Sequence, residues 1–339
     1  MDGLTLPDTI KAADSYPLKP LLAPWWAGGP HTHTLLASWL RPDYGPCFER
    51  ERLETTDDDF IDLDWTVDPG DGAPIVLLLH GLEGSSDRGY MRNVACELLH
   101  RGVRAVAMNF RGCSGETNRQ LRFYHSGETS DPVLVLKAIR ERFPDRRLGA
   151  MGFSLGGNII LKAMGERDDG GTGILDACVA MSVPYDLAAG CSMLERSVMG
   201  RVYGDYFMRS LRQKVSTKRE GLAEVLDMDQ VDRARTIRAF DEIVTAPLNG
   251  FDDADDYYRR CSSAAFLPEV RVPTLLLHAR NDPFLPADSI PEARAAANPD
   301  IRMVTTDYGG HVGFIQGSLR KPDFWGDRAG AAFLADALG

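Results

Sequence analysis

A serine between two glycines is the first candidate for chemistry in the sequence. Residues 152–156 read GFSLG, which fits the pattern Gly-x-Ser-x-Gly, and the apolar segment that follows from Asn158 is suited to a helix. In a nucleophile elbow this pattern holds a serine on a strained turn between a strand and a helix, and the small residues let the two elements approach closely. The pattern therefore predicts that Ser154 is a nucleophile.

A serine nucleophile needs a histidine to take its proton and a carboxylate to orient that histidine. The chain supplies both downstream of Ser154, in the order expected after such an elbow: first Asp282, then His311. Each follows an apolar run that is suited to a strand, and open parallel sheets place their functional groups at the carboxyl ends of strands. Asp307 is the alternative acid, because it lies close to His311 in the sequence.

Acyl chemistry on a serine also requires N–H donors for the negative charge that develops on the substrate's carbonyl oxygen. One donor is expected from the residue after the nucleophile, which is Leu155, and another from the loop after an early strand. That loop reads HGLEG at residues 80–84, and its glycines permit the turn that would direct the amide of Leu82 into the site. The reaction predicted from these groups requires no cofactor and no metal.

The elements that must position these groups form an α/β pattern. Between short apolar runs lie longer amphipathic segments, such as residues 89–100 and 131–142, which predicts a mostly parallel central sheet with helices on both faces. In the second of these helices Asp131 is expected at the N-cap and Pro132 at the first helical position. Six strands are predicted, at residues 74–80, 103–109, 148–153, 177–183, 273–279 and 301–305.

One long segment interrupts this alternation. Residues 185–265 read as helical and mixed in charge, so we expect a helical cap inserted into the core. The predicted organisation is an N-terminal arm at 1–60 packing on the core, an α/β core at 61–184 and 266–339, and the cap. Apolar cap residues such as Tyr206 and Phe207 are expected to line a pocket for short-to-medium acyl chains.

Composition narrows the classes of function. The 38 Lys and Arg residues against 49 Asp and Glu residues give a net charge of −11, which disfavours binding to nucleic acid. No run approaches the about 18 apolar residues of a transmembrane helix, and the first residues lack the layout of a signal peptide. Six cysteines without metal-type or disulfide-type spacing predict buried free thiols and a cytoplasmic setting. Nothing in the sequence predicts the oligomeric state.

Eight short segments resemble a known family: HGLEGSS (80–86), NFRGCSGE (109–116), YHSGET (124–129), GFSLGGN (152–158), TAPLNGF (245–251), DYYRRCSS (256–263), RNDPF (280–284) and GGHVGF (309–314). They resemble the α/β-hydrolases, and within them the YheT-like group, or AB hydrolase family 4, of carboxylesterases and lipases. The resemblance implies the α/β-hydrolase fold and hydrolysis of small-molecule or lipid-like carboxylic esters. It places the nucleophile, acid and base at Ser154, Asp282 and His311. Residues 28–34 depart from it, since relatives read more like N-x-H-x-Q-T there.

Several features have two interpretations. His31 and His33 form an H-x-H, which we interpret as structural rather than metal-binding because no nearby acid or cysteine completes a ligand set. The acidic runs at 57–59 and 252–256 lack a calcium-loop pattern and predict solvated turns or helix starts. For His125 a hydrogen-bonding structural role is favoured, and Trp25 and Trp26 are expected to pack on the core rather than contact a membrane. The alternatives to an esterase are an acyltransferase with the same acyl-enzyme and a non-catalytic binding module.

Overall fold

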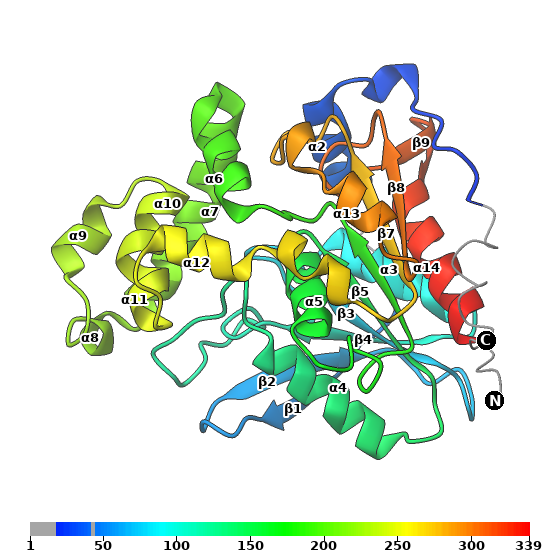
Figure 1. The fold of residues 1–339 in the computed structure, drawn as a ribbon, viewed down its shortest axis with the longest axis horizontal. Coiled ribbons are helices and arrows are strands. Elements are labelled where there is room, and N and C mark those ends of the chain that lie inside the picture. Colours follow the sequence, from blue (N-terminus) through cyan, green and yellow to red (C-terminus); the bar gives the residue numbers. More distant parts are fainter. Residues whose placement is uncertain (1–17, 42–44) are drawn as a thin grey trace, which may run out of the picture.

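The predicted apolar runs pair into one twisted sheet in the computed structural model, which describes residues 18–41 and 45–339. Its order is β1-β2-β4-β3-β5-β6-β7-β8 (Figure 1). The strands from β3 to β8 are parallel, whereas β2 pairs antiparallel with β1 and β4. The strands are β1 (Glu49–Glu54), β2 (Phe60–Trp65), β3 (Ile75–Leu79), β4 (Arg104–Asn109), β5 (Leu148–Phe153), β6 (Ala177–Met181), β7 (Thr274–Ala279) and β8 (Ile301–Thr306).

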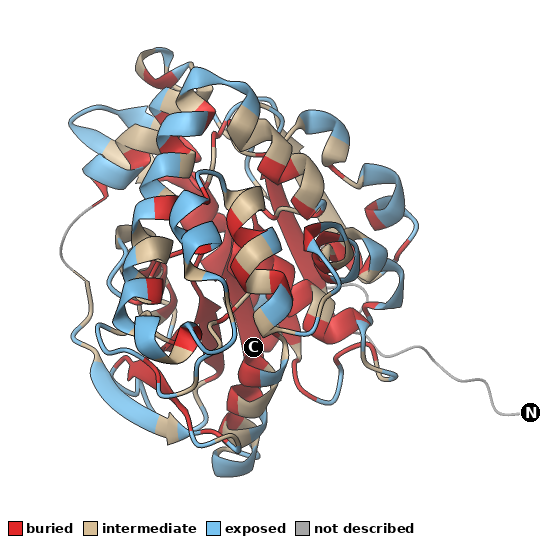
Figure 2. Cartoon of the chain, turned by 90° about the vertical axis from the view of Figure 1, so that its left-hand side faces the viewer, coloured by how far each residue is buried: buried red, intermediate tan, exposed pale blue. Residues whose placement is uncertain are grey.

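Helices cover both faces of this sheet, as the alternation predicted. On one face α3 (Gly89–Leu99) and α14 (Trp325–Leu338) enclose an apolar cluster with the sheet, and on the other α4 (Ser130–Arg142) and α5 (Leu155–Gly165) enclose a second one. Figure 2 shows the central strands buried behind helices whose outer surfaces are exposed. Burial on both faces explains why strands such as β3, with the sequence IVLLL, have no alternating polar residues.

The chain between β6 and β7 is almost entirely helical and lies to one side of the sheet (Figure 1). It has an apolar cluster of its own, which includes Met208, Leu222 and Phe240. Side chains of Asp186, Ser197 and Asp253 cap three of its helices. The elements are α6 (Leu187–Arg196), α7 (Val198–Thr217), α8 (Arg219–Leu222), α9 (Met228–Arg233), α10 (Ile237–Phe240), the π-helical turn η2 (Asp241–Thr245), α11 (Ala246–Leu248) and α12 (Ala254–Cys261).

Short elements complete the fold around the sheet. The helix α2 (Pro30–Leu40) packs through Ala37 against a hairpin of β9 (Ile315–Ser318) and β10 (Lys321–Phe324). Trp26 joins this cluster, but Trp25 is 93% exposed, so the expectation that both tryptophans pack on the core is only half right. The remaining elements are η1 (Trp25–Ala27), η3 (Ser263–Ala265), η4 (Leu267–Glu269), η5 (Ala287–Ser289) and α13 (Glu292–Ala296).

The six predicted strands and both predicted helices are confirmed, with ends that differ by a residue or two. One detail is wrong: α4 begins at Ser130 with Thr129 at the N-cap, so Asp131 and Pro132 lie within the first turn. Asp131 is held there by Arg111, whose Nη2 lies 2.7 Å from its Oδ1. The antiparallel strands β1 and β2 and the β9–β10 hairpin were not predicted.

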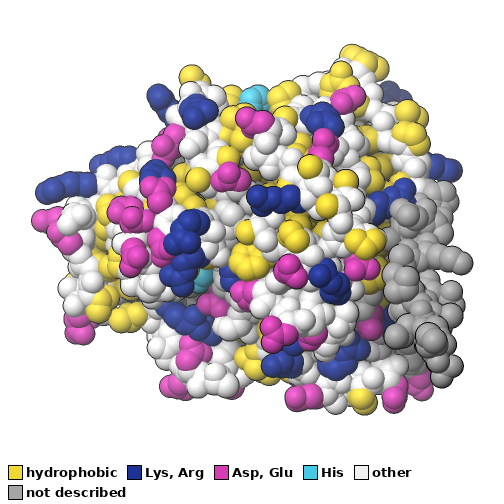
Figure 3. Space-filling model, viewed as in Figure 1, with side chains coloured by type: hydrophobic (Ala, Val, Ile, Leu, Met, Phe, Trp, Pro, Cys, Tyr) yellow, Lys and Arg dark blue, Asp and Glu magenta, His cyan; other side chains and the backbone are white. Residues whose placement is uncertain are grey.

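The first acidic run, at residues 57–59, differs from the predicted solvated turn or helix start. Asp57 and Asp59 are not a solvated turn, because Arg111 Nη1 lies 2.8 Å from Asp57 and 3.0 Å from Asp59, whose side chain is fully buried. By contrast Asp253 begins a helix, as predicted for the second acidic run. Over the face shown in Figure 3, basic and acidic side chains are interspersed rather than separated by sign.

The cysteines are free thiols, as predicted, and their burial varies. Cys178, Cys191 and Cys261 are buried, Cys96 and Cys113 are partly buried, and Cys47 is exposed, which contradicts the prediction that all are buried. Within residues 18–41 and 45–339, no helix is both long enough and apolar enough to span a membrane. The predicted absence of a signal peptide concerns residues that lie mostly outside the described part of the chain.

Candidate active site

The turn after β5 has the geometry that a nucleophile elbow requires. Ser154 has φ 50° and ψ −119°, a left-handed conformation that side chains rarely adopt, and it directly precedes α5. A Cβ atom added at Gly152 would lie 2.5 Å from the carbonyl oxygen of Gly156, and one added at Gly156 would lie 2.4 Å from that of Leu79. Only glycine fits at these two positions, which explains the flanking residues of the motif.

Two hydrogen bonds connect the three residues that the sequence placed in order. His311 Nε2 lies 2.9 Å from Ser154 Oγ, and His311 Nδ1 lies 2.8 Å from Asp282 Oδ2. The Asp282 side chain is fully buried, and its Oδ1 accepts a further bond from the amide of Phe284. Asp307, the alternative acid, is 82% exposed and lies 4.0 Å from Arg280, so the structure brings Asp282 rather than Asp307 to the histidine.

The turn that carries His311 is held by α2, which the sequence did not connect with the site. The amide of His311 donates to Thr34 Oγ1 at 3.0 Å, and Arg41 Nη2 donates to the carbonyl oxygen of Val312 at 2.6 Å. Arg41 is itself fixed by a buried ion pair with Asp327. Because these partners lie more than 270 residues apart in the sequence, no local motif could have indicated them.

The loop after β3 leaves one amide available beside Ser154. The amide of Gly81 donates to Tyr90 Oη and that of Glu83 to Tyr124 Oη, whereas that of Leu82, among the described residues, has no acceptor. Leu155 is the first residue of α5, so its amide is one of the donors that a helix leaves unpaired at its N-terminus. Both leucines line the cavity at Ser154.

A buried histidine fixes the start of this loop. His80 Nδ1 lies 2.7 Å from the carbonyl oxygen of Gly81, and the amide of Phe110 donates to His80 Nε2 at 3.2 Å. The ring is therefore neutral, with its proton on Nδ1. Burial lowers the pKa of His80 to about 3, so it stays neutral across the physiological range. Its role is structural, because both ring nitrogens are occupied by the backbone.

Helix α7 contacts the same loop through an ion pair. Lys214 Nζ lies 2.7 Å from Glu83 Oε1, and the side chains are 16% and 2% exposed. The hydroxyl of Tyr124 donates to the same carboxylate at 2.8 Å, and that of Ser210 donates to its other oxygen. Glu83 has φ 53°, so these side chains hold an unfavourable backbone conformation next to Leu82.

The cavity in front of Ser154 has a volume of about 100 Å³ and is mainly apolar. Leu194 and Phe207 from the segment between β6 and β7 line it, which agrees with the expectation for that segment. Tyr206 does not: it is half-exposed and its Oη accepts a hydrogen bond from Arg88. Other lining residues include Ser154, Leu187, Ile237, Phe284, Leu285 and His311.

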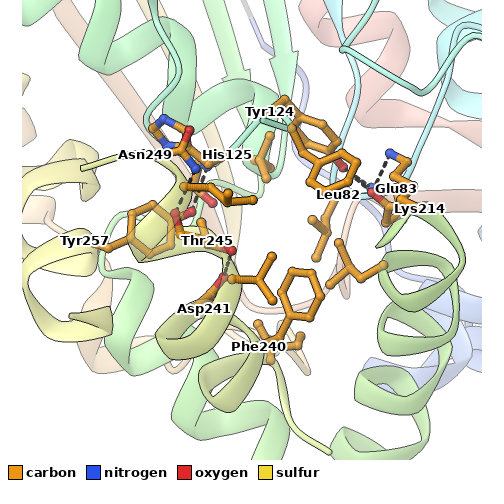
Figure 4. A pocket seen from close by; sticks show the side chains of 17 residues that line it. Leu82, Glu83, Tyr124, His125, Lys214, Phe240, Asp241, Thr245, Asn249 and Tyr257 are labelled. Atoms are coloured by element: carbon orange, nitrogen blue, oxygen red, sulfur yellow. Dashed lines mark hydrogen bonds and ion pairs between the residues drawn. The ribbon is translucent and has the colours of Figure 1, made fainter. Parts of the chain in front are cut away.

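A second cavity, of about 70 Å³ and shown in Figure 4, shares lining residues with the first. Leu82, Leu155 and Asp241 belong to the walls of both. His125 lines the second cavity, is almost fully buried, and accepts a hydrogen bond from the amide of Gly127, as expected for a structural histidine. Burial lowers the pKa of His125 to about 4, so it is uncharged near neutral pH.

The H-x-H motif has a structural environment. His31 Nδ1 lies 3.2 Å from Tyr203 Oη on α7, and His33 is buried, with its pKa lowered to about 4 by that burial. Over residues 18–41 and 45–339, no three His, Cys, Asp or Glu side chains are grouped so that they could hold a metal ion.

Comparisons with known proteins agree with this geometry. The family model described as alpha/beta hydrolase fold matches residues 74–318. The chain is 38% identical over 299 residues to "Putative esterase YheT" of Escherichia coli (strain K12), covering 87% of each chain. It is 32% identical over 317 residues to Phospholipase ABHD3 of Mus musculus, covering 91% of this chain and 76% of that protein. Among solved structures, the Pyrococcus furiosus esterase Pf2001 has a TM-score of 0.58 at 19% identity, covering 94% of this chain and 97% of that chain.

The chain belongs to the α/β-hydrolase family, within its esterase and lipase group. The resemblance predicted from the eight segments, and the fold that it implied, are therefore confirmed.

Proposed function

We propose that this carboxylic ester hydrolase acts through an acyl-enzyme formed on Ser154. The observation that supports the proposal most is the chain of two hydrogen bonds from Ser154 through His311 to Asp282. Ser154 Oγ attacks the ester carbonyl carbon while its proton passes to His311 Nε2. As the bond to the alcohol breaks, His311 returns the proton to the leaving oxygen, and a water molecule then repeats the sequence to release the acid. Asp282 accepts a hydrogen bond from His311 Nδ1–H and stabilises the imidazolium that forms.

The amides of Leu82 and Leu155 are proposed to stabilise the oxyanion. Both leucines line the cavity with Ser154, and the amide of Leu82 has no other acceptor among the described residues, which supports this role. Donors already fixed in place cost no reorganisation when charge develops on the carbonyl oxygen, and one such donor is worth about 10²–10³ in kcat.

Small carboxylic esters with short-to-medium acyl chains are the proposed substrates. The apolar walls of the two cavities support this choice, since burial of each CH₂ group contributes about 0.8 kcal/mol of binding. One relative is named a phospholipase, which is consistent with lipid-like esters. A cytoplasmic location stays a prediction.

We propose the same organisation of the chain as the sequence predicted. Residues 185–265 act as a cap over a core formed by 61–184 and 266–339, and residues 1–60 form an arm. Support for the cap comes from its separate apolar cluster and from its contribution to both cavities.

Replacing Ser154 with Ala tests the proposal directly. We expect esterase activity to fall by about 10⁶-fold without loss of the fold, because the nucleophile is removed. A fluorophosphonate probe should label the wild type and Ser126→Ala, whose serine lines the same cavity, but not Ser154→Ala. Equal labelling of Ser154→Ala would place the nucleophile elsewhere. Product analysis separates hydrolysis from acyl transfer: a hydrolase releases the carboxylic acid in water, whereas an acyltransferase forms a new ester when an alcohol is added. Labelling of Ser154 without turnover of any ester would favour the binding-module alternative.

A further inference from the structure

The two adjoining cavities differ in which of the proposed catalytic groups line them. His311 and Ser154 line the first cavity and not the second, whereas the two amides proposed for the oxyanion belong to residues that line both. The leaving oxygen of an ester must lie within reach of His311, because that histidine protonates it. On the proposed function, the alcohol therefore leaves through the first cavity, and the acyl group extends past Leu82 and Leu155 into the second.

One buried carboxylate lies in the wall that the cavities share. Asp241 is 8% exposed, and its two oxygens accept hydrogen bonds from Thr245 Oγ1 and Tyr258 Oη, both at 2.7 Å. Within the described residues no cation forms an ion pair with it. The charge of Arg238 acts on Asp241, but its guanidinium is bound to Asp255 at 2.7 Å.

Such a carboxylate is unfavourable for the fold alone. Burial without an opposite charge disfavours the ionised form, and burial raises the pKa of Asp241 to about 6, so the group is still mainly ionised above pH 7. A carboxylate offers about four acceptor positions, and the hydroxyls of Thr245 and Tyr258 use two of them. Acceptor capacity therefore remains on a charged group that borders both cavities.

The backbone around Asp241 is also unusual. Residues Asp241–Thr245 form a single π-helical turn, a conformation that is rare and is frequently found at functional sites. This turn brings Asp241 and Thr245 together on one side of the second cavity, opposite Leu82 and Tyr124 (Figure 4). Phe240 and Val244 line the cavity beside them, while His125, Asn249 and the Lys214–Glu83 pair are among its other polar lining groups.

We propose that Asp241 makes the second cavity selective for acyl groups that carry a hydroxyl, so that hydroxyacyl esters are preferred over plain alkanoyl esters of the same length. The apolar walls bind the methylene groups, and the hydroxyl donates a hydrogen bond to the Asp241 carboxylate. An ammonium group fits less well, because a primary ammonium loses more hydration than a hydroxyl on burial.

A pair of substrates of nearly equal size isolates this effect. We would compare p-nitrophenyl 6-hydroxyhexanoate with p-nitrophenyl heptanoate, in which a methyl group replaces the hydroxyl, and include p-nitrophenyl 6-aminohexanoate. A hydrogen bond to a charged acceptor predicts that kcat/KM for the hydroxyacyl ester exceeds that for the alkanoyl ester by about tenfold or more. The ratio is measured on the wild-type protein, so it does not depend on the folding of any variant.

The variant Asp241→Asn should bring the ratio near one, and Asp252→Asn, an exposed acid of the same segment, should keep the wild-type ratio. A wild-type ratio of one or below, a preference for the ammonium ester, or an unchanged ratio in a folded Asp241→Asn would overturn the inference. So would a preference that appears only when the hydroxyl is on the alcohol side of the ester. Failure of the proposed function is distinct, since it would appear as turnover of these esters by Ser154→Ala.

Discussion

The ion pair between Lys214 and Glu83 allows a direct test of how the loop at Leu82 is held. In Lys214→Met the carboxylate of Glu83, which is 2% exposed, loses its counter-charge and keeps only hydroxyl donors from Tyr124 and Ser210. Removing one partner of a buried pair costs about 3–5 kcal/mol, and because two donors remain we expect about 3 kcal/mol of lost unfolding free energy.

Lys214→Met should also lower the rate of ester hydrolysis. Glu83 directly follows Leu82, and its own amide donates to Tyr124 Oη at 2.7 Å, so a shift of the carboxylate moves the proposed oxyanion amide. Complete loss of such a donor lowers kcat about 10²–10³-fold, and a displaced donor should lower it about tenfold or more, with a smaller change in KM. Urea unfolding measures the first effect and steady-state ester hydrolysis the second.

Two further variants isolate the cause. Glu83→Gln combined with Lys214→Met removes both charges and should recover much of the stability lost in the single variant. Lys218→Met is the matched control, since Lys218 follows the same helix but bonds to Asn118 and Gln120 rather than to the loop. A folded Lys214→Met protein with the kcat of the wild type would refute the coupling between this ion pair and the site.

The remaining predictions concern the acid and the pH dependence of stability. Asp282→Asn should lower kcat by about 10³–10⁴ with little change in KM, because the imidazole tautomer is no longer fixed, while Asp307→Asn stays near wild type in the same assay; the reverse ranking would assign the acid to Asp307. Burial lowers the pKa of His278 to about 4, so below pH 6.5 the unfolded chain takes up this proton first and stability falls with acidification. Between pH 7.5 and pH 5, the free energy of unfolding of His278→Phe, measured with urea, should therefore rise by about 2 kcal/mol relative to that of the wild type. An equal pH dependence of the two proteins would contradict this.

The parallel part of the sheet could be predicted because its strands are buried on both faces and therefore read as continuous apolar runs. The antiparallel edge could not, since β1 reads ERERLE and β2 contains two aspartates. Those strands are joined by side-chain ion pairs across their register, with Arg50 2.8 Å from Asp64 and Arg52 2.8 Å from Asp62. A charged strand is stable here because its charges are paired across strands, which sequence periodicity does not reveal.

The candidate triad could be predicted because a nucleophile elbow has a short local motif, and because a serine nucleophile requires an acid and a histidine further along the chain. The groups that hold it could not, since each acts through a distant partner. Thr34 of helix α2 and Arg41, which directly follows that helix, bind the turn of His311. Helix α7 binds the loop of Leu82 through Lys214. The proposed base and the proposed oxyanion donor are thus each fixed by a segment outside the parallel sheet. In the chain, Lys214 lies 131 residues from Glu83, and Thr34 lies 277 residues from His311. The geometry of the proposed catalytic groups therefore depends on the packing of α2 and α7 as much as on the strands after which Ser154, Asp282 and His311 follow.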